Sequence, residues 1–210
     1  MRTHRDQVII LKSKNYSEAD KILTVFGKEF GKFSLLAKGV RRLTSKNRGN
    51  IQTLSIVDIS FYKAQGIPLL LETSVVHIPD FTNFDVKNSE RVLHLVSKLI
   101  PEEQKYSKVF DALRSAIQKG LIDEYTSRFR MLLLMEEGLM DNLKACSECG
   151  GMSEKRYIQL SNFVLLCENC YINKGLIEKD FMVVDSSLYS DLRFVSALDQ
   201  YINNLLINIL

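Results

Sequence analysis

The sequence predicts an α+β protein of several domains, with an N-terminal β-barrel, a helical domain and a cysteine-bearing insert before a last helix. Up to about Pro79, short apolar runs alternate with turn-forming residues, which is typical of strands. Beyond Pro79 the apolar residues recur every three or four positions, which is typical of amphipathic helices. The four cysteines form two Cys-x-x-Cys pairs with seventeen residues between the pairs.

Five strands are expected in about the first 80 residues, which suits a small antiparallel barrel. Phe33, Leu35 and Ala37 occupy alternate positions, as residues of one strand face do, with Ser34 and Leu36 on the other face. The stretch LAKGVRRLTSKNRGN, residues 36–50, contains five cations and can bury little. We expect it to be the loop between the third and fourth strands.

Four helices are expected after the barrel. The first should begin behind Ser89 and end at Pro101, the second should end at Gly120, and the third should end before Gly138. The last should begin behind Ser186 or Ser187 and pack on the other three. Its apolar stripe consists of Leu188, Leu192, Val195, Leu198, Ile202, Leu205, Leu206 and Ile209.

The positive charge is concentrated at the N-terminal end. Residues 1–48 contain twelve Lys or Arg against four Asp or Glu, a net charge of +8, whereas residues 49–210 carry −5. This asymmetry suggests a polyanionic partner, with nucleic acid the first candidate and a membrane surface the second. Alternatively the lysines only solvate strand faces, and charge counting does not separate these interpretations.

The composition, 46% hydrophobic and 25% charged, is that of an ordinary globular protein. No apolar run approaches the roughly 18 residues of a membrane span. The N-terminal run from Val8 to Leu11 has four residues, fewer than the about 7–15 of a signal-peptide core. We therefore expect a cytoplasmic protein without a membrane partner.

The cysteine pairs, Cys146 with Cys149 and Cys167 with Cys170, have the spacing of a structural zinc site. A hairpin about Asn162 should complete a zinc ribbon with one Zn²⁺ per chain. A disulfide framework would need an oxidising compartment, and a thioredoxin-like redox site would need one pair within a βαβ unit. We favour zinc over both.

The sequence offers no case for an active site. The three histidines show no ligand spacing, and no glycine-rich phosphate loop or nucleophile elbow is present. A zinc-dependent nuclease or deaminase would need an open coordination position, which four cysteines close. We expect a protein that is not an enzyme.

Two stretches resemble the RecO family of bacterial recombination mediators. The first, VIILKSKNYSEADKILTVFGKEFGKFSLLAKGVRR, resembles the opening of the family, and RFRMLLLMEEGLMDNLKACSECGG resembles its central helix and first zinc pair. The residues that carry the first likeness are Tyr16, Glu18, Asp20, Phe26, Gly31, Lys32, Lys38, Gly39, Arg41 and Arg42. The chain is short for the family, and its last predicted helix ends without a basic tail.

The resemblance implies an N-terminal OB-fold, a helical domain and a non-catalytic role in RecF-pathway repair. Family members bind single- and double-stranded DNA, anneal complementary strands and bind the C-terminal tail of the single-strand-binding protein SSB. They act with RecR to load RecA, which implies a protein associated with the nucleoid. Some relatives lack the cysteines, so zinc would be an accessory of this fold.

The expected DNA-binding residues are basic side chains of the barrel with one aromatic that could stack on a base. They are Lys32, Lys38, Arg41, Arg42, Lys46, Arg48 and Tyr62. Arg128 and Arg130 flank Phe129 and are a weaker hypothesis for the SSB tail, because a cation beside an apolar groove suits an acidic peptide with an apolar end.

The predicted domains are residues 1–80 as the OB-fold, 81–145 as the helical domain, 146–180 as the zinc ribbon and 181–210 as the last helix. The main alternative function is an RNA-binding adaptor that docks a protein partner through the zinc ribbon and the helices. A strong preference for RNA over single-stranded DNA would favour this alternative.

Overall fold

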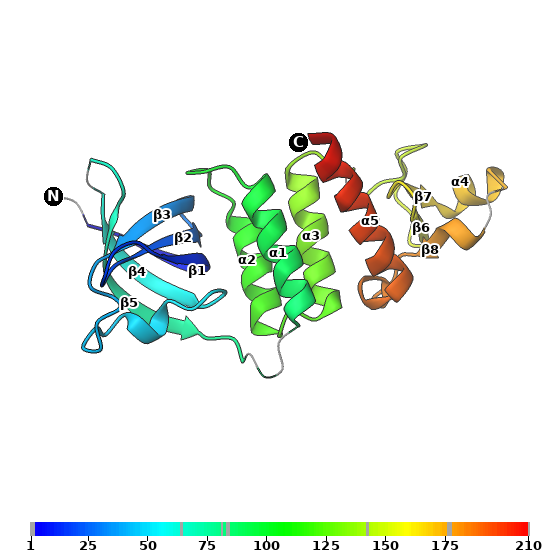
Figure 1. Ribbon diagram of the computed structural model, residues 1–210. Helices are drawn as coiled ribbons and strands as arrows, with labels where there is room; N and C mark the ends of the chain where they lie inside the picture. The colour runs from blue at the N-terminus through cyan, green and yellow to red at the C-terminus, as the bar shows by residue number, and fades with distance from the viewer. Residues whose placement is uncertain are drawn as a thin grey trace. The chain divides into compact units, whose positions relative to one another are not determined.

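The computed structural model describes residues 3–63, 65–80, 82, 85–141, 143–175 and 178–209 (Figure 1). The chain divides into two compact units, residues 1–122 and 123–210. The predicted α+β class is confirmed, while the division into four domains stays a prediction. Among the described residues, no helix has both the length and the apolar character to cross a membrane.

The first unit begins with the predicted five-stranded barrel. Its strands are β1 (Thr3–Asn15), β2 (Lys21–Gly27), β3 (Gly31–Ala37), β4 (Ile56–Tyr62) and β5 (Leu69–His77). They close in the order β1-β2-β3-β5-β4, and β4 also pairs with β1. This is a five-stranded barrel of the OB type. The basic stretch lies between β3 and β4, as predicted.

The barrel core follows from the alternation of each strand. The core residues have one parity on each strand, and four of them, Val8, Leu23, Leu35 and Ile59, are at most 3% exposed. Phe33 belongs to the same core, as its alternation with Leu35 and Ala37 predicted. Residues of the other parity face outward, because successive side chains of a strand point to opposite sides.

The helices α1 (Val86–Leu99) and α2 (Ser107–Gln118) complete the first unit and lie beside the barrel (Figure 1). Phe26, which faces outward from β2, is fully buried and meets the ring of Phe110 at 5.7 Å. Lys28 forms an ion pair with Asp111 at 3.0 Å. The helices therefore cover an apolar part of the outer barrel surface.

The start of α1 corrects one prediction. We expected Ser89 to cap this helix, but Asp85 is the N-cap residue, and its carboxylate accepts the amide of Asn88 at 2.9 Å. Ser89 lies in the first turn, where its hydroxyl donates to the Asp85 carbonyl. A carboxylate also interacts favourably with the positive end of the helix dipole, which a serine hydroxyl does not.

The second unit combines helices with a small sheet. It contains α3 (Asp123–Glu136), β6 (Arg156–Gln159), β7 (Leu165–Cys167), α4 (Glu168–Asn173), β8 (Phe181–Val183) and α5 (Leu192–Ile209). β6 and β7 form the predicted hairpin, and β8 pairs with the other edge of β6. Neither β8 nor α4 was expected from the sequence, because both are too short for a clear periodicity.

The start of α5 corrects a second prediction. We expected Ser186 or Ser187 to precede this helix directly, but Leu188–Ser190 forms a separate 3-10 turn before it. At the actual start, the Asp191 carboxylate accepts the amide of Arg193 at 2.8 Å. An aspartate therefore caps this helix as well. The predicted apolar stripe begins within the 3-10 turn, so it could not show where the helix starts.

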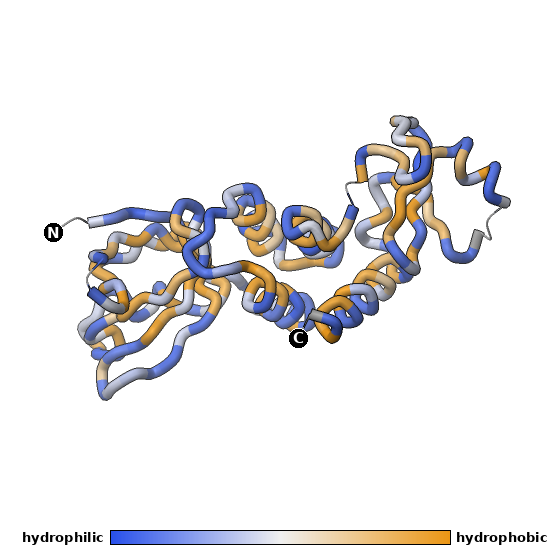
Figure 2. Tube along the Cα trace, turned by 90° about the horizontal axis from the view of Figure 1, so that it is seen from above, coloured by the Kyte–Doolittle hydropathy of each residue, from blue (hydrophilic) through white to orange (hydrophobic). Residues whose placement is uncertain are grey.

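Val195, Leu198, Ile202 and Leu206 of the predicted stripe are buried on α5, but Leu192, which we expected in the stripe, is 77% exposed. Hydrophobic and hydrophilic residues alternate along this helix in Figure 2, and Phe194, Leu198 and Ile202 are buried. Within the second unit, α5 and α3 are joined by an ion pair between Asp199 and Arg130 at 2.6 Å. The predicted packing of α5 on the first two helices stays a prediction.

We predict that Gly31→Ala destabilises the first unit by at least about 2 kcal/mol. Gly31 has φ +69°, and an added Cβ would lie 2.0 Å from the Gln104 carbonyl oxygen. The measurement is urea unfolding followed by circular dichroism. Gly49→Ala is the matched control, since nothing lies within 4 Å of its Cβ position. Equal stability of the two variants would contradict the prediction.

Candidate nucleic-acid interface and metal centre

The basic loop, residues 38–55, is attached to the free edge of β5. β3 and β5 pair at one position only, Leu36 with Leu69, so β5 beyond this point needs other partners. The Asn47 amide oxygen accepts the backbone amide of Thr73 at 3.1 Å, and the Asn47 amide group donates to the Leu71 carbonyl. Asn47 thus provides hydrogen bonds that a neighbouring strand would otherwise make.

The beginning of the loop is attached to the β1–β2 turn. The Asp20 carboxylate accepts the amide of Gly39 at 2.8 Å. Arg41 donates twice, from its backbone amide to the Ala19 carbonyl and from its guanidinium to the Ser17 carbonyl, each at 2.9 Å. The two parts of the first family-like stretch, around Asp20 and around Arg41, therefore meet in space.

The loop brings together five of the predicted DNA-binding cations on one exposed segment. Lys38, Arg41, Arg42, Lys46 and Arg48 are all exposed. No acidic residue occurs between Glu29 and Asp58, so the segment carries no compensating charge of its own. The arginines present forked donors that suit phosphate oxygens.

A pocket of about 330 Å³ opens at the mouth of the barrel beside this loop. It is lined by Asn15, Lys21, Val40, Arg41, Arg48 and Ile51. We call it the mouth pocket. Among the residues that the structure describes, no carboxylate lines it, whereas three cations do.

Lys21 was not among the predicted DNA-binding residues. Its signal was available, because Lys21 precedes the inward-facing Leu23 by two positions and so continues the inner face of β2. The register places Lys21 between Asn15 of β1 and Ala37 of β3. Without the register, however, Lys21 could not be distinguished from a solvated lysine at a strand end.

Lys32 is held apart from the loop cations. Its ammonium donates to the Ser97 carbonyl of α1 at 2.9 Å, and its carbonyl accepts the amide of Glu103. Burial lowers the pKa of this ammonium below its ordinary value, although the charge of Glu102 opposes the shift. Lys32 thus joins β3 to the helical part of the first unit.

Tyr62 lies at the end of β4 and is half-buried. It pairs with Leu69 of β5, which in turn pairs with Leu36 of β3. Tyr62 therefore lies two strands away from the start of the basic loop. Its parity puts it on the outer surface, whereas the neighbouring Phe61 is 1% exposed and belongs to the core.

The two arginines of α3 already have partners within the second unit. Arg130 is 2% exposed and forms the ion pair with Asp199. Arg128 is exposed, forms an ion pair with Glu124 at 3.0 Å and lies 4.6 Å from the centre of the Tyr189 ring. Of the two, Arg128 is the one that a partner molecule could reach without displacing a buried ion pair.

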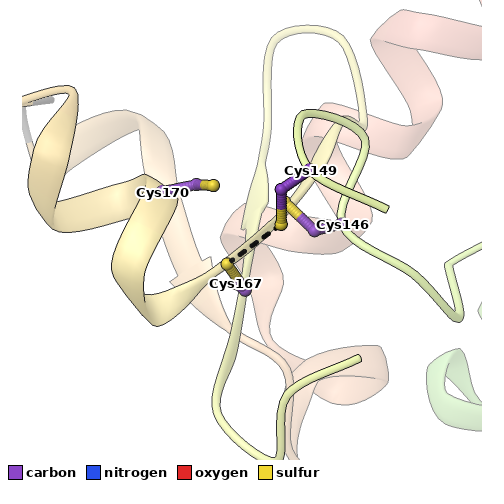
Figure 3. Close-up of side chains that lie close together, drawn as sticks. All are labelled: Cys146, Cys149, Cys167 and Cys170. Carbon is purple, nitrogen blue, oxygen red and sulfur yellow. Dashed lines mark hydrogen bonds between the residues drawn. The ribbon is translucent and has the colours of Figure 1, made fainter. Parts of the chain in front are cut away.

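The four cysteines converge in the second unit (Figure 3). Their sulfur atoms all lie within 4.8 Å of one another, and Cys149 Sγ and Cys167 Sγ are 3.8 Å apart. Cys146 and Cys149 belong to the turn before β6, Cys167 ends β7, and Cys170 lies on α4. The sulfur atoms point toward a common centre in Figure 3.

The backbone around the first pair is that of a metal-binding turn. The amide of Gly150 donates to the Cys146 carbonyl at 2.9 Å, and Gly150 has φ +70°. The amide of Gly151 donates to Cys149 Sγ at 3.4 Å. Amide donors near sulfur stabilise the thiolate form, which is the form that binds a metal.

The ionisation of the cysteines is unequal. Burial raises the pKa of Cys146, but the backbone amides of Cys149, Cys167 and Glu148 together outweigh it and lower this pKa to about 6. Hydrogen bonds to the neighbouring sulfurs raise the pKa of Cys170 to about 12. Four thiolates at this separation need a cation between them.

These residues fit one structural Zn²⁺. Four sulfur ligands from two Cys-x-x-Cys pairs match the closed tetrahedral sites of zinc ribbons, in which all four positions are occupied by protein. Such a metal would hold β6, β7 and α4 together. It would leave no coordination position for a substrate.

The fold and the two sites define a class of protein: an OB-type barrel with a cationic mouth, joined to helices and a four-cysteine ribbon. Residues 1–79 match the family model described as Recombination protein O N terminal. DNA repair protein RecO of Mesoplasma florum is 31% identical over 185 residues, which cover 82% of this chain and 68% of the relative. The chain belongs to the RecO family.

Two further relatives, also named DNA repair protein RecO, support this assignment. The protein of Heliobacterium modesticaldum is 29% identical over 71% of this chain and 57% of its own length. That of Thermoanaerobacter sp. is 26% identical over 81% of this chain and 72% of its own length. The matches therefore extend beyond the barrel into the second unit.

We predict that cobalt substitution gives thiolate-to-metal absorption of a four-sulfur site, and that Cys170→Ser lowers its intensity and weakens zinc binding. Metal-free protein should lose the β6–β7–β8 sheet, because zinc contributes on the order of 10 kcal/mol in small zinc domains. Ser147→Ala, between the first two ligands, is the matched control. Zinc bound equally tightly by Cys170→Ser would contradict a four-cysteine site.

Proposed function

We propose that this protein is a non-catalytic mediator of DNA repair and recombination that binds single- and double-stranded DNA and anneals complementary strands. The observation that carries the proposal is the basic loop, whose five exposed cations are held on a barrel rim without an acidic neighbour in the loop. Membership of the RecO family supports a role in repair and recombination.

The loop chemistry suits binding without sequence preference. Exposed Arg and Lys side chains contact phosphates, which every strand carries, whereas reading a sequence needs contacts to base edges. A protein that anneals strands must accept any complementary pair. Neutralising phosphates on both strands lowers the repulsion that slows their encounter.

The stretch that carries the cations is attached near both of its ends, through Gly39 to Asp20 and through Asn47 to β5, so its backbone is held in place before a strand arrives. Ordering before binding lowers the entropy cost of the complex. Tyr62 adds a candidate stacking surface on the outside of β4, worth roughly 1–3 kcal/mol if a base stacks on it.

The proposed partners are RecR and the C-terminal tail of SSB, and the proposed outcome is the loading of RecA on SSB-coated DNA in the nucleoid. For the SSB tail, Arg128 is the candidate, because it is exposed and lies over the ring of Tyr189. An acidic peptide with an apolar end would meet a cation and an aromatic surface there.

Salt should weaken binding to single-stranded DNA steeply. If Lys38, Arg41, Arg42, Lys46 and Arg48 all contact phosphates, the slope of log K against log salt concentration is about −3.5. Fluorescence anisotropy of a labelled dT oligonucleotide between low and moderate salt measures this slope. A slope near zero would exclude a phosphate interface of this size.

Annealing of complementary oligonucleotides tests the function directly. Wild type should speed annealing of naked and of SSB-coated strands, and the triple variant Arg41→Glu, Arg42→Glu and Lys46→Glu should lose both activities. Reversing three charges turns attraction to phosphate into repulsion without removing a buried apolar group. Circular dichroism checks that the variant is folded.

A control with the same change of charge separates the loop from net charge. Lys87, Lys98 and Lys179 are exposed and lie outside the barrel, so their joint replacement by Glu should preserve most of the annealing rate. If both triple variants lose annealing equally, the loop is not the site. If wild type binds RNA far more tightly than DNA and does not anneal, the RNA-binding adaptor replaces the mediator.

A further inference from the structure

We propose that the mouth pocket binds one phosphate group through Lys21, Arg41 and Arg48. This inference rests in part on the proposed function, because the phosphate would belong to a bound nucleic acid. It goes further, because it assigns a defined anion site inside the barrel rim, and it includes a residue outside the basic loop.

The inward face of the barrel becomes polar at its mouth. Asn15, Lys21 and Ala37 lie side by side in one row across β1, β2 and β3. Ala37 is 2% exposed and still belongs to the core, while Lys21 is half-buried. Lys21 therefore continues the row of core residues and ends in a pocket rather than on the outer surface.

Two of the lining residues are apolar and buried, and we call them the floor of the pocket. Val40 and Ile51, which are 2% and 4% exposed, line the pocket and also belong to the barrel core. A low-polarity floor weakens solvent screening of the charges above it. An anion in this pocket would thus interact more strongly with the cations than one at an exposed loop.

Two of the three cations are placed by the rest of the fold. One Nη atom of Arg41 is used on the Ser17 carbonyl, which orients the guanidinium and leaves further donors for a ligand. Arg48 follows Asn47 directly, and Asn47 is tied to Thr73 of β5. The arrangement is therefore built from two separate anchors and not from flexible surface lysines.

Three like charges around one pocket repel one another unless an anion is present. Nearby Asp20 does not neutralise them within the pocket, since it accepts the Gly39 amide and is not among the lining residues. The charges that line another cavity of the barrel are different. A cavity of about 520 Å³ over β1, β4 and β5 is lined by four carboxylates and two cations.

The ligand chemistry is that of a phosphate. Forked guanidinium donors match its oxygens in pairs, and an ammonium adds a point charge. The volume of about 330 Å³ is within the roughly 300–1,000 Å³ of small-ligand pockets. The phosphate could be a backbone phosphodiester or a phosphomonoester at a strand end.

The test compares Lys21→Gln with Lys14→Gln. Lys14 pairs with Ile22 on the same two strands but is exposed and not among the lining residues of the pocket, so the two variants lose the same charge at neighbouring places. The probe is inorganic phosphate, compared with sodium chloride at equal ionic strength. Its effect is measured as a rise in the melting temperature and as competition against a 3′-labelled dT oligonucleotide.

Wild type and Lys14→Gln should be stabilised by phosphate beyond the effect of chloride. Lys21→Gln should lose about tenfold in phosphate affinity, because one charged donor is removed. Lys21→Arg should restore binding, which separates loss of charge from a folding defect. If Lys21→Gln binds phosphate as wild type does, the proposal is wrong.

Two oligonucleotides distinguish the source of the phosphate. Tighter binding of a 5′-phosphorylated strand than of a 5′-hydroxyl strand, lost in Lys21→Gln, assigns the pocket to strand ends. Equal binding of both, weakened in Lys21→Gln, assigns it to backbone phosphates. If no oligonucleotide binds but phosphate binding depends on Lys21, the mouth pocket stands and the proposed DNA function fails.

Discussion

The first unit depends on how its barrel closes between β3 and β5. The two strands pair at a single position, Leu36 with Leu69, and most of that edge of β5 would otherwise expose unpaired backbone groups. Unpaired edges are costly in a barrel core and prone to association. Asn47 and Asn50 supply hydrogen bonds to this edge at Thr73, and the basic loop that carries them also lines the mouth pocket.

This closure explains why a charged loop is also an ordered one. The same residues that complete the β5 edge hold Arg48, and the contacts of Asp20 and Ser17 hold Gly39 and Arg41. The cations are therefore presented by hydrogen bonds that the barrel needs for its own stability. Binding and folding share a small set of contacts around the mouth.

Basic residues serve two different purposes in this chain. Lys28, Lys32 and Arg130 hold parts of each unit together, through Asp111, the Ser97 carbonyl and Asp199 respectively. The cations of the basic loop are instead exposed, and those around the mouth pocket converge on a space that no carboxylate lines among the described residues. In the second unit, the four-cysteine cluster gives a small sheet a source of stability that its limited core could not supply.

The barrel, the helices and the four metal ligands could be read from local patterns, because strand alternation, helical periodicity and Cys-x-x-Cys spacing involve residues close in the chain. The helix caps could not, because Asp85 and Ser89 are both suitable N-cap residues and only the folded geometry selects Asp85. The roles of Lys21 and Lys32 could not be read from local patterns either, because the two lysines look alike in the sequence. Strand register puts Lys21 at the mouth of the barrel, and the packing of α1 removes Lys32 from it. Contacts between distant segments decide such roles, since a side chain's function depends on the groups that the fold brings to it.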